Sequence, residues 1–237
     1  MTSVPALMTV TLRELRLILE RLVQAAGVPT GLLPSVRDCA LYSAALPGPG
    51  FADMASRIEL LRQSRPAPLY PVAETPTLVI DGAGQHAWYV AQTLLDLAIE
   101  GFLRTGRGDV LARNVVAPDE LRVVAGLAEA QGVRADAVPR GDGVILRVSP
   151  RPAREQTLLD RIRRHGLPVE PATWWRLYHA SQAALAPDSF ESRRHAGTIR
   201  VEADGRVVGR HDEDETDLSM LAPDPARLRI SPTPPAF

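Results

Sequence analysis

The chain has 237 residues, a hydrophobic content of 45% and a formal net charge of -1, which is ordinary globular composition. The near-neutral charge argues against binding to nucleic acid or to an anionic membrane, and we expect neither partner. All 27 basic residues are arginine. Chemistry that needs a lysine amine, such as a Schiff base or a P-loop lysine, is therefore excluded.

The N-terminal stretch lacks the basic start and long apolar core of a signal peptide. Apolar runs stay well below the roughly 18 residues that a membrane span needs. From these two features we expect a cytoplasmic protein. The single cysteine, Cys39, lies in an apolar helical stretch, where buried packing is the expected role.

Helical signals dominate the first third of the chain. Thr11 and Glu14 form a capping box before an apolar face with helical spacing, and Gly27 is placed to end that helix. Two further helices are expected over about 32–46 and 51–62.

Strand and helix patterns then alternate. Residues 77–80 are expected to form a buried strand, 81–84 a tight loop and 85–103 a helix. The elements expected next are strands at 108–112, 133–138 and 144–148, helices at 118–131 and 155–164, and a helix opened by Pro171. Asp204-Gly205 predicts a hairpin over 198–210.

This order predicts an α/β fold, with a mixed sheet covered by helices, an N-terminal helical segment and a C-terminal β-hairpin. We expect one domain over residues 4–221, with a sub-boundary near 150–153. The proline-rich stretch 222–237 is expected to be a disordered tail.

Candidate chemistry gathers where the first expected strand meets its helix. Gly82 and Gly84 follow the strand, so amides there could hold a phosphate at the helix N-terminus. The alternative is an ordinary strand-to-helix turn, because the full G-x-G-x-x-G pattern is absent. His86, expected one turn into the helix, is a candidate acid or base. Its alternative role is packing against Trp88 and Tyr89.

The C-terminal third offers other candidates. Trp174 and Trp175 point about 100° apart on a helix, so one of them is expected at a cleft or an interface. Arg193 and Arg194 are suited to clamp a carboxylate or phosphate, unless they only decorate a surface loop. His179, His195 and His211 match no compact metal-ligand spacing, so we expect no metal site, although the sequence leaves their convergence open.

Several segments resemble the malate/L-lactate/L-sulfolactate dehydrogenase family over about residues 10–135. They are Ala25-Ala26-Gly27-Val28, the stretch from Pro68-Leu69 to Glu74-Thr75-Pro76, Asp81-Gly82, the helix Val90–Gly106 and Arg113-Asn114. The chain departs from the family at both of its histidine positions. Pro47-Gly48-Pro49-Gly50 occupies the region of the first, and Ala117 stands at the second. Residues 174–197 resemble an uncharacterised bacterial domain family that carries no known activity.

The resemblance implies a relative of nicotinamide-dependent 2-hydroxy-acid dehydrogenases. Because a hydride transfer to a keto acid needs a proton donor, the missing histidines favour a catalytically degenerate relative that acts as a small-molecule-binding protein or non-catalytic subunit. The alternative is an active NAD(P)-dependent oxidoreductase on a small keto or hydroxy acid, with His86 as proton donor. NAD or NADP, a small carboxylate, a protein partner and self-association are all compatible with these hypotheses. The contacts expected for a ligand are Asp81, Gly82, Gly84, Arg113 and Asn114.

Overall fold

The computed structural model describes residues 7–74, 77–152 and 155–185, together with 200–201 and 207–208. The chain divides into two compact units, residues 1–185 and 186–237. The expected single domain over 4–221, its sub-boundary and its tail remain predictions. No helix among the described residues is both long and apolar enough to cross a membrane.

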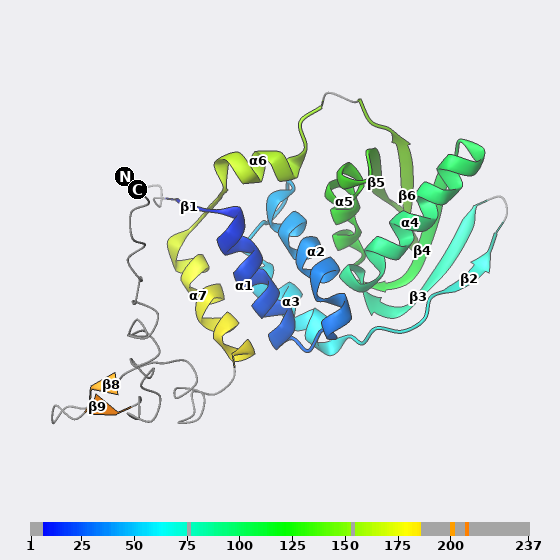
Figure 1. Ribbon diagram of the computed structural model, residues 1–237. Helices are drawn as coiled ribbons and strands as arrows, with labels where there is room; N and C mark the ends of the chain where they lie inside the picture. Colours follow the sequence, from blue (N-terminus) through cyan, green and yellow to red (C-terminus); the bar gives the residue numbers. More distant parts are fainter. Residues whose placement is uncertain (1–6, 75–76, 153–154, 186–199, 202–206, 209–237) are drawn as a thin grey trace, which may run out of the picture. The chain divides into compact units, whose positions relative to one another are not determined.

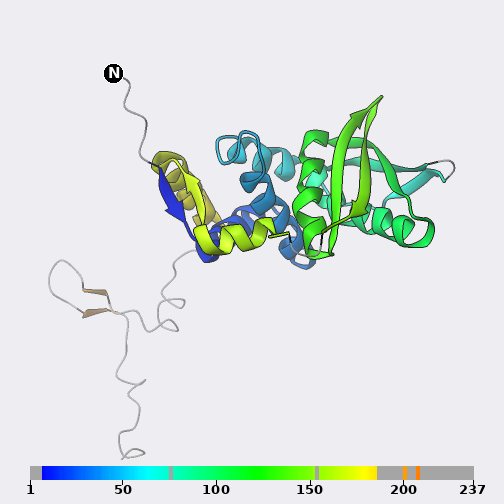
Figure 2. The same cartoon turned by 90° about the horizontal axis from the view of Figure 1, so that it is seen from above.

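The first unit contains an N-terminal group of helices and a mixed sheet, which lie beside each other in space (Figures 1 and 2). Its helices are α1 Leu12–Ala25, α2 Leu33–Ala45, α3 Met54–Gln63, α4 Ala87–Thr105, α5 Val124–Ala130, α6 Leu158–His165 and α7 Pro171–Ser181. Its 3₁₀ turns are η1 Thr30–Leu32, η2 Pro118–Val123 and η3 Gln182–Ala184.

The helical group begins as the sequence predicts. Thr11 caps α1, its side-chain oxygen accepting from the Glu14 amide while the Glu14 carboxylate accepts from the Thr11 amide. Gly27 follows the end of α1 with φ +85°, a conformation that glycine adopts without strain. The buried side chains of α1 face α2 and α7.

The sheet has five strands in the order β2-β3-β4-β6-β5. They are β2 Tyr70–Ala73, β3 Leu78–His86, β4 Gly108–Val116, β5 Val133–Arg140 and β6 Gly143–Pro150. Only β3 and β4 run parallel, and the other neighbouring strands are antiparallel. This mixed sheet with its covering helices confirms the predicted α/β class.

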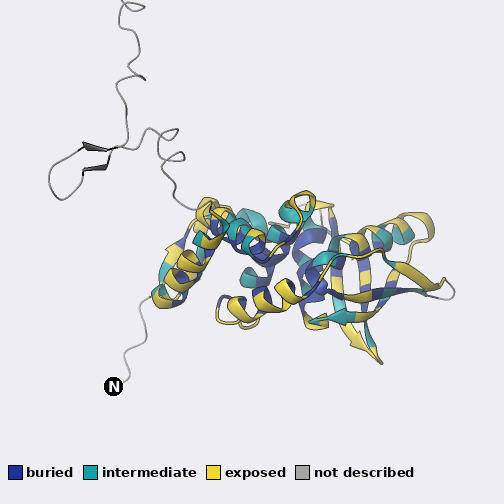
Figure 3. Cartoon of the chain, turned by 90° about the horizontal axis from the view of Figure 1, so that it is seen from below, coloured by how far each residue is buried: buried dark blue, intermediate teal, exposed yellow. Residues whose placement is uncertain are grey.

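One face of the sheet is buried beneath α4 and α5 (Figures 1 and 3). The side chains of Val110, Ala112 and Leu146 are buried there, whereas Asp109 and Arg147 point to the opposite, exposed face. The resulting core is continuous with the interior of the helical group, where α2 contacts both α4 and α5.

Two strand pairings were not expected. The first joins β1, Met8–Val10, to β7, Leu167–Val169, as a two-stranded antiparallel sheet. The second adds β2 to the edge of the main sheet beside β3. Of the second unit the structure describes β8, Arg200–Val201, and β9, Val207–Val208, which pair antiparallel as the predicted hairpin requires.

The expected tight loop at 81–84 is wrong, because β3 continues through these residues to His86. Between the pairs Asp81↔Arg113 and Gln85↔Val115 the register shifts, so the strand carries a bulge. The helix that follows begins at Ala87, and His86 is its N-cap rather than a residue of its first turn. The helix expected over 118–131 begins as the 3₁₀ turn η2 and becomes α-helical only at Val124.

Candidate functional site

The β3 bulge and the end of β4 form an unusual piece of backbone. Ala83, Asn114 and Ala117 all have φ between 50° and 53°, in the left-handed region that non-glycine residues seldom adopt. Gly84 lies there too, with φ +68°. Such conformations cluster at functional sites, where the surrounding structure holds them in place. This part of the fold is therefore a candidate binding site.

Asp81 organises the bulge. Its Oδ1 accepts from the Ala83 amide and from Asn114 Nδ2, each at 2.8 Å. These hydrogen bonds, the backbone one first, hold the pKa of the Asp81 carboxyl below its usual value. The structure thus brings together Asp81, Gly84, Arg113 and Asn114, which the sequence analysis had selected.

Of the two alternatives for Gly82 and Gly84, a phosphate cradle or an ordinary turn, the contacts at these residues do not support the cradle. A Cβ at Gly82 would lie 2.6 Å from Val115 Cγ2 and 3.0 Å from the Asn114 carbonyl oxygen, so Gly82 permits the close approach of β4. The Ala83 amide already donates to Asp81. At the start of α4, the Trp88 amide donates to His86 Nδ1. The residues at this turn therefore do not fit the phosphate of a dinucleotide.

Beside the bulge lies an open cleft of about 650 Å³, which we call the β4 cleft. The last residues of β4, the start of η2 and the β5–β6 turn line it. Its charged and amide side chains are Arg113, Asn114, Asp119, Arg122 and Asp142, and its apolar lining includes Val115, Pro118, Ala137, Pro139 and Val144. The volume falls within the range of small-molecule sites.

Arg113 is the basic residue most available to a ligand in this cleft. Its Nε lies 2.9 Å from Asp142 Oδ1 on the β5–β6 turn, and the two side chains are 44% and 68% exposed. Exposed pairs of this kind contribute about 1 kcal/mol at most, so a ligand can replace Asp142 cheaply. Asn114 stands next to Arg113, with its amide nitrogen directed to Asp81.

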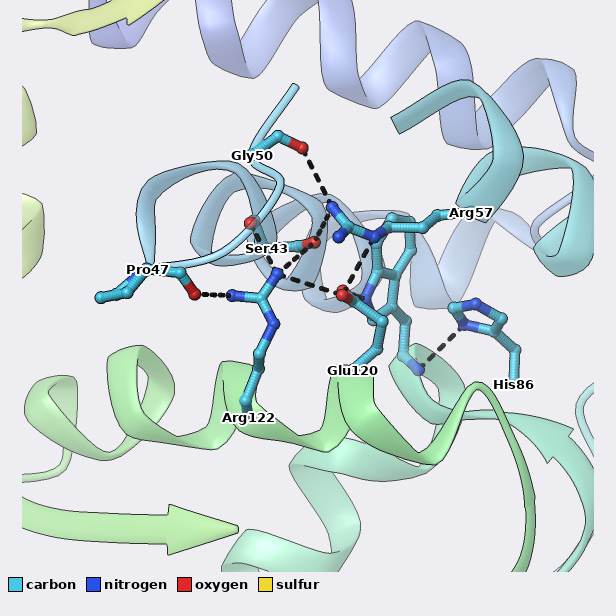
Figure 4. A network of polar contacts seen from close by, with 8 residues as sticks. Ser43, Pro47, Gly50, Arg57, His86, Glu120 and Arg122 are labelled. Atoms are coloured by element: carbon cyan, nitrogen blue, oxygen red, sulfur yellow. Dashed lines mark hydrogen bonds and ion pairs between the residues drawn. The ribbon is translucent and has the colours of Figure 1, made fainter. Parts of the chain in front are cut away.

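Arg122 connects the cleft to a buried polar network (Figure 4). One of its terminal nitrogens donates to the Ser43 carbonyl oxygen and to Glu120 Oε1, and the other to the Pro47 carbonyl oxygen. Glu120, 1% exposed, also pairs with Arg57 Nε at 3.0 Å and accepts from Trp88 Nε1 at 3.0 Å. This network holds Arg122 in place and leaves little freedom for it to follow a ligand.

His86 is sealed inside the protein. Its side chain has no exposed surface and its ring packs edge-on against Trp88, with centroids 5.0 Å apart. Burial lowers its pKa to about 4, although the Glu120 charge acts in the opposite direction. With Nδ1 accepting from the Trp88 amide, the neutral ring carries its proton on Nε2, which has no hydrogen-bond partner among the described residues. The lowered pKa favours the neutral imidazole near pH 7, and the buried ring has no surface open to a substrate.

The two tryptophans of α7 differ in exposure, and the role of either at a cleft or an interface stays a prediction. Trp174 is buried and packs edge-on against Phe51, with centroids 6.2 Å apart. Trp175 is 50% exposed and lies against Tyr178 and His179 on the outer face of the helix. Arg193, Arg194, His195 and His211 lie outside the described residues. Within the described part of the chain, no group of histidine, cysteine and acidic residues is arranged to hold a metal.

The sequence analysis missed the network around Glu120. Its members come from α2, α3, α4 and η2, so their meeting depends on the packing of elements that are distant in the chain. The sequence offers one weak sign, an acidic residue at a position that helical spacing turns toward the core.

No protein-family model matches the chain, and no curated protein does either. Solved structures do resemble it in part. Malate dehydrogenase from Entamoeba histolytica has 16% identity and a TM-score of 0.45, over 88% of this chain and 60% of that one. Malate dehydrogenase from Pyrococcus horikoshii has 17% identity and a TM-score of 0.44, over 77% and 66%.

Sulfolactate dehydrogenase from Methanocaldococcus jannaschii has 15% identity and a TM-score of 0.41, over 86% of this chain and 61% of that one. The chain thus spans less than two thirds of each of these proteins. The partial resemblance to malate and sulfolactate dehydrogenases agrees with the one seen in the sequence motifs. A likeness of this size carries no argument about this chain.

Proposed function

We propose that this chain is a small-molecule-binding protein that takes a small carboxylate in the β4 cleft and does not transfer a proton through His86. The observation that carries the proposal is the placement of Arg113 and Asn114 on a cleft of about 650 Å³. A planar guanidinium can bind both oxygens of a carboxylate, which adds specificity as well as affinity. The exposed Asp142 forms only a weak ion pair with the Arg113 guanidinium.

The position of the cleft supports a ligand site. It lies where β4 ends, and in open α/β sheets ligands bind beyond the carboxyl ends of the strands. The left-handed residues Asn114 and Ala117 stand at the same end of β4. Their strained backbone is compatible with a site whose geometry is set before the ligand arrives.

The environment of His86 supports a role without proton transfer. A general acid must come within hydrogen-bonding reach of the reacting group, directly or through one water. His86 has no exposed surface, and its ring is enclosed by Trp88 and the start of α4. Its pKa of about 4 also leaves it almost fully deprotonated near pH 7. The group is thus better suited to capping α4 than to donating a proton.

Calorimetric titration with acetate, pyruvate and malate tests the proposal. We expect saturable binding of at least one of them, and a loss of roughly 10- to 100-fold in Arg113→Gln, because hydrogen bonds to charged groups contribute about 1.5–3 kcal/mol. Arg134→Gln is the matched control. Arg134 is also half-exposed and paired with a carboxylate, Glu155, but does not line the cleft.

A flat titration with every carboxylate, or equal affinity in Arg113→Gln and the unaltered protein, would overturn the carboxylate site. A parallel assay follows NADH and NADPH absorbance with each keto acid. We expect no oxidation of either nucleotide. Turnover that persists in His86→Asn would support an oxidoreductase with another proton donor, and turnover lost in that variant would restore His86 as the donor.

One observation favours a second function, that of a non-catalytic subunit. Trp175, Tyr178 and His179 form an exposed aromatic group on α7, with Trp175 and Tyr178 5.4 Å apart between ring centroids. Exposed tryptophan and tyrosine are typical anchors of protein interfaces. If this face joins copies of the chain, light scattering at increasing concentration should detect a dimer that Trp175→Ala dissociates. An unchanged mass in both proteins would exclude self-association through this face.

A further inference from the structure

A second cavity, of about 260 Å³, lies among α1, α3 and α7, away from the residues of the β4 cleft. Its walls are mainly apolar. Leu22 belongs to α1, Ile58 to α3, Leu177 to α7, and Phe51 precedes α3. The ring of Phe51 is held in place by Trp174. The three helices all belong to the first unit, where α7 lies beside α1 (Figure 1).

The cavity exists because small side chains stand where the helices face one another. Ala25 on α1, Ala55 on α3 and Ala180 on α7 all line it, together with Ala52 just before α3. Packed helices ordinarily fill such spaces, since ridges of side chains enter the grooves of the neighbouring helix. A water molecule has a share of about 30 Å³ in the liquid. The cavity is therefore large enough for an organic group of several carbon atoms.

The rim of the cavity carries an unbalanced positive charge. Arg62 and Arg176 are its basic residues and Glu59 is its one acidic residue. Glu59 pairs with Arg62. The guanidinium of Arg176 donates to Thr173 Oγ1 at 3.2 Å, and among the described residues it forms no ion pair. The Thr173 hydroxyl, itself buried, donates a hydrogen bond to Glu170 Oε2 at 2.8 Å. One charged group thus remains available at the mouth of an apolar space.

We propose that this cavity binds an amphipathic monocarboxylate, a molecule with one carboxylate and an aliphatic body. The aliphatic body occupies the space left by the alanines. It is thereby transferred from water to an apolar environment, which favours binding. The carboxylate accepts from Arg176 at the rim and neutralises its charge. This ligand differs from the small polar carboxylate of the β4 cleft, because here the apolar body is required for binding.

The test uses octanoate and the full chain, with affinity measured by calorimetric titration. We expect saturable binding of octanoate, at least tenfold weaker binding of acetate, which lacks the body, and of octanol, which lacks the charge. Arg176→Gln should weaken octanoate binding at least tenfold. Ala55→Leu, which places a larger side chain in the cavity, should abolish it.

The controls separate the site from surface effects and from the β4 cleft. Arg163→Gln removes an exposed arginine on α6, and Ala172→Leu enlarges an exposed alanine on α7 that does not line the cavity. Both should bind octanoate like the unaltered chain, and so should Arg113→Gln. The proposal is overturned if the unaltered chain does not bind octanoate saturably, if Arg113→Gln, which lacks the guanidinium of the β4 cleft, binds acetate as tightly as octanoate, or if Arg176→Gln and Ala55→Leu leave the affinity for octanoate unchanged. If only Arg113→Gln lost octanoate binding, the octanoate site would lie in the β4 cleft instead of this cavity.

Discussion

The carboxylate of Glu120 accepts hydrogen bonds from Trp88 and Arg122 and forms an ion pair with Arg57, while being 1% exposed. Replacing one member of such a group leaves the other charges buried without their partner. This destabilises the fold more than replacing the whole group with apolar residues would. We expect Glu120→Gln to lower the free energy of unfolding by about 3–5 kcal/mol. Urea titration followed by circular dichroism measures the change.

Glu155→Gln is the matched control for this variant. Glu155 forms an exposed pair with Arg134, so its loss should change the free energy of unfolding by about 1 kcal/mol or less. Equal effects of the two substitutions would contradict a stabilising role for the buried network. A large loss in Glu120→Gln alone would confirm that the network joins η2 to α2 and α3.

His86 predicts how stability depends on pH. Its pKa is lowered by burial from 6.5 to about 4, so between these values the unfolded chain binds a proton that the folded chain does not. The free energy of unfolding should therefore fall by about 3 kcal/mol as the pH decreases from 6.5 to 4, through this residue alone. Urea titrations at several pH values measure the slope.

The variant His86→Asn isolates this contribution, since asparagine is also a good N-cap but does not titrate in this range. Acidic residues titrate in both proteins, and only the difference between the two slopes belongs to the histidine. Parallel pH profiles in the two proteins would mean that the pKa of His86 is the same in the folded and the unfolded chain.

In helix α5, helix propensity alone predicts the wrong effect on stability for the replacement of Gly126 by alanine. Alanine is ordinarily more favourable than glycine inside a helix by about 0.5–1 kcal/mol. At Gly126, however, a Cβ would lie 2.2 Å from Cδ1 of the Tyr42 ring on α2. We expect Gly126→Ala to destabilise the protein by about 1–3 kcal/mol, because overpacking exceeds the gain in propensity.

Gly31→Ala is the comparison for Gly126→Ala. No atom of the described residues, apart from the neighbours of Gly31 in the chain, lies within 4 Å of a Cβ built at Gly31. That substitution should leave the midpoint of thermal unfolding unchanged or raise it slightly. A midpoint that rises equally in both variants would show that α5 and α2 can separate enough to admit the methyl group.

Elements with local signals were predictable from the sequence, and those set by distant contacts were not. The cap at Thr11 depends on residues three positions apart, and the pairing of β8 with β9 was expected from the adjacent Asp204-Gly205, so both were found. Strand β1 has three residues and is defined only by its pairing with β7. The stretch 81–84 has loop composition, yet β4 approaches Gly82 so closely that the stretch becomes a bulge within β3.

The same distinction applies to the candidate site. Asp81, Arg113 and Asn114 were selected from a family resemblance, and the parallel pairing of β3 with β4 places them together. The surroundings of His86 depend on Trp88, Ser64 and Glu120, which come from three parts of the chain. Its burial therefore could not be inferred from its place at the start of a helix.

At the scale of the whole molecule, the division between residues 185 and 186 predicts that the first unit folds alone. A fragment of residues 1–185 should unfold cooperatively in urea, with a midpoint close to that of the full chain. If the single domain of 4–221 predicted from the sequence is correct, the fragment should instead lose cooperativity. Circular dichroism of the two proteins distinguishes these outcomes.

The pairing of β1 with β7 has a consequence for synthesis on the ribosome. Met8 pairs with Val169, and α1 packs against α7. The first helix thus emerges long before its final neighbour exists, whereas every strand of the main sheet lies between them in the chain. We expect the sheet to form first during translation, while the part of the apolar face of α1 that packs against α7 remains uncovered and available to chaperones until the last helix of the unit appears.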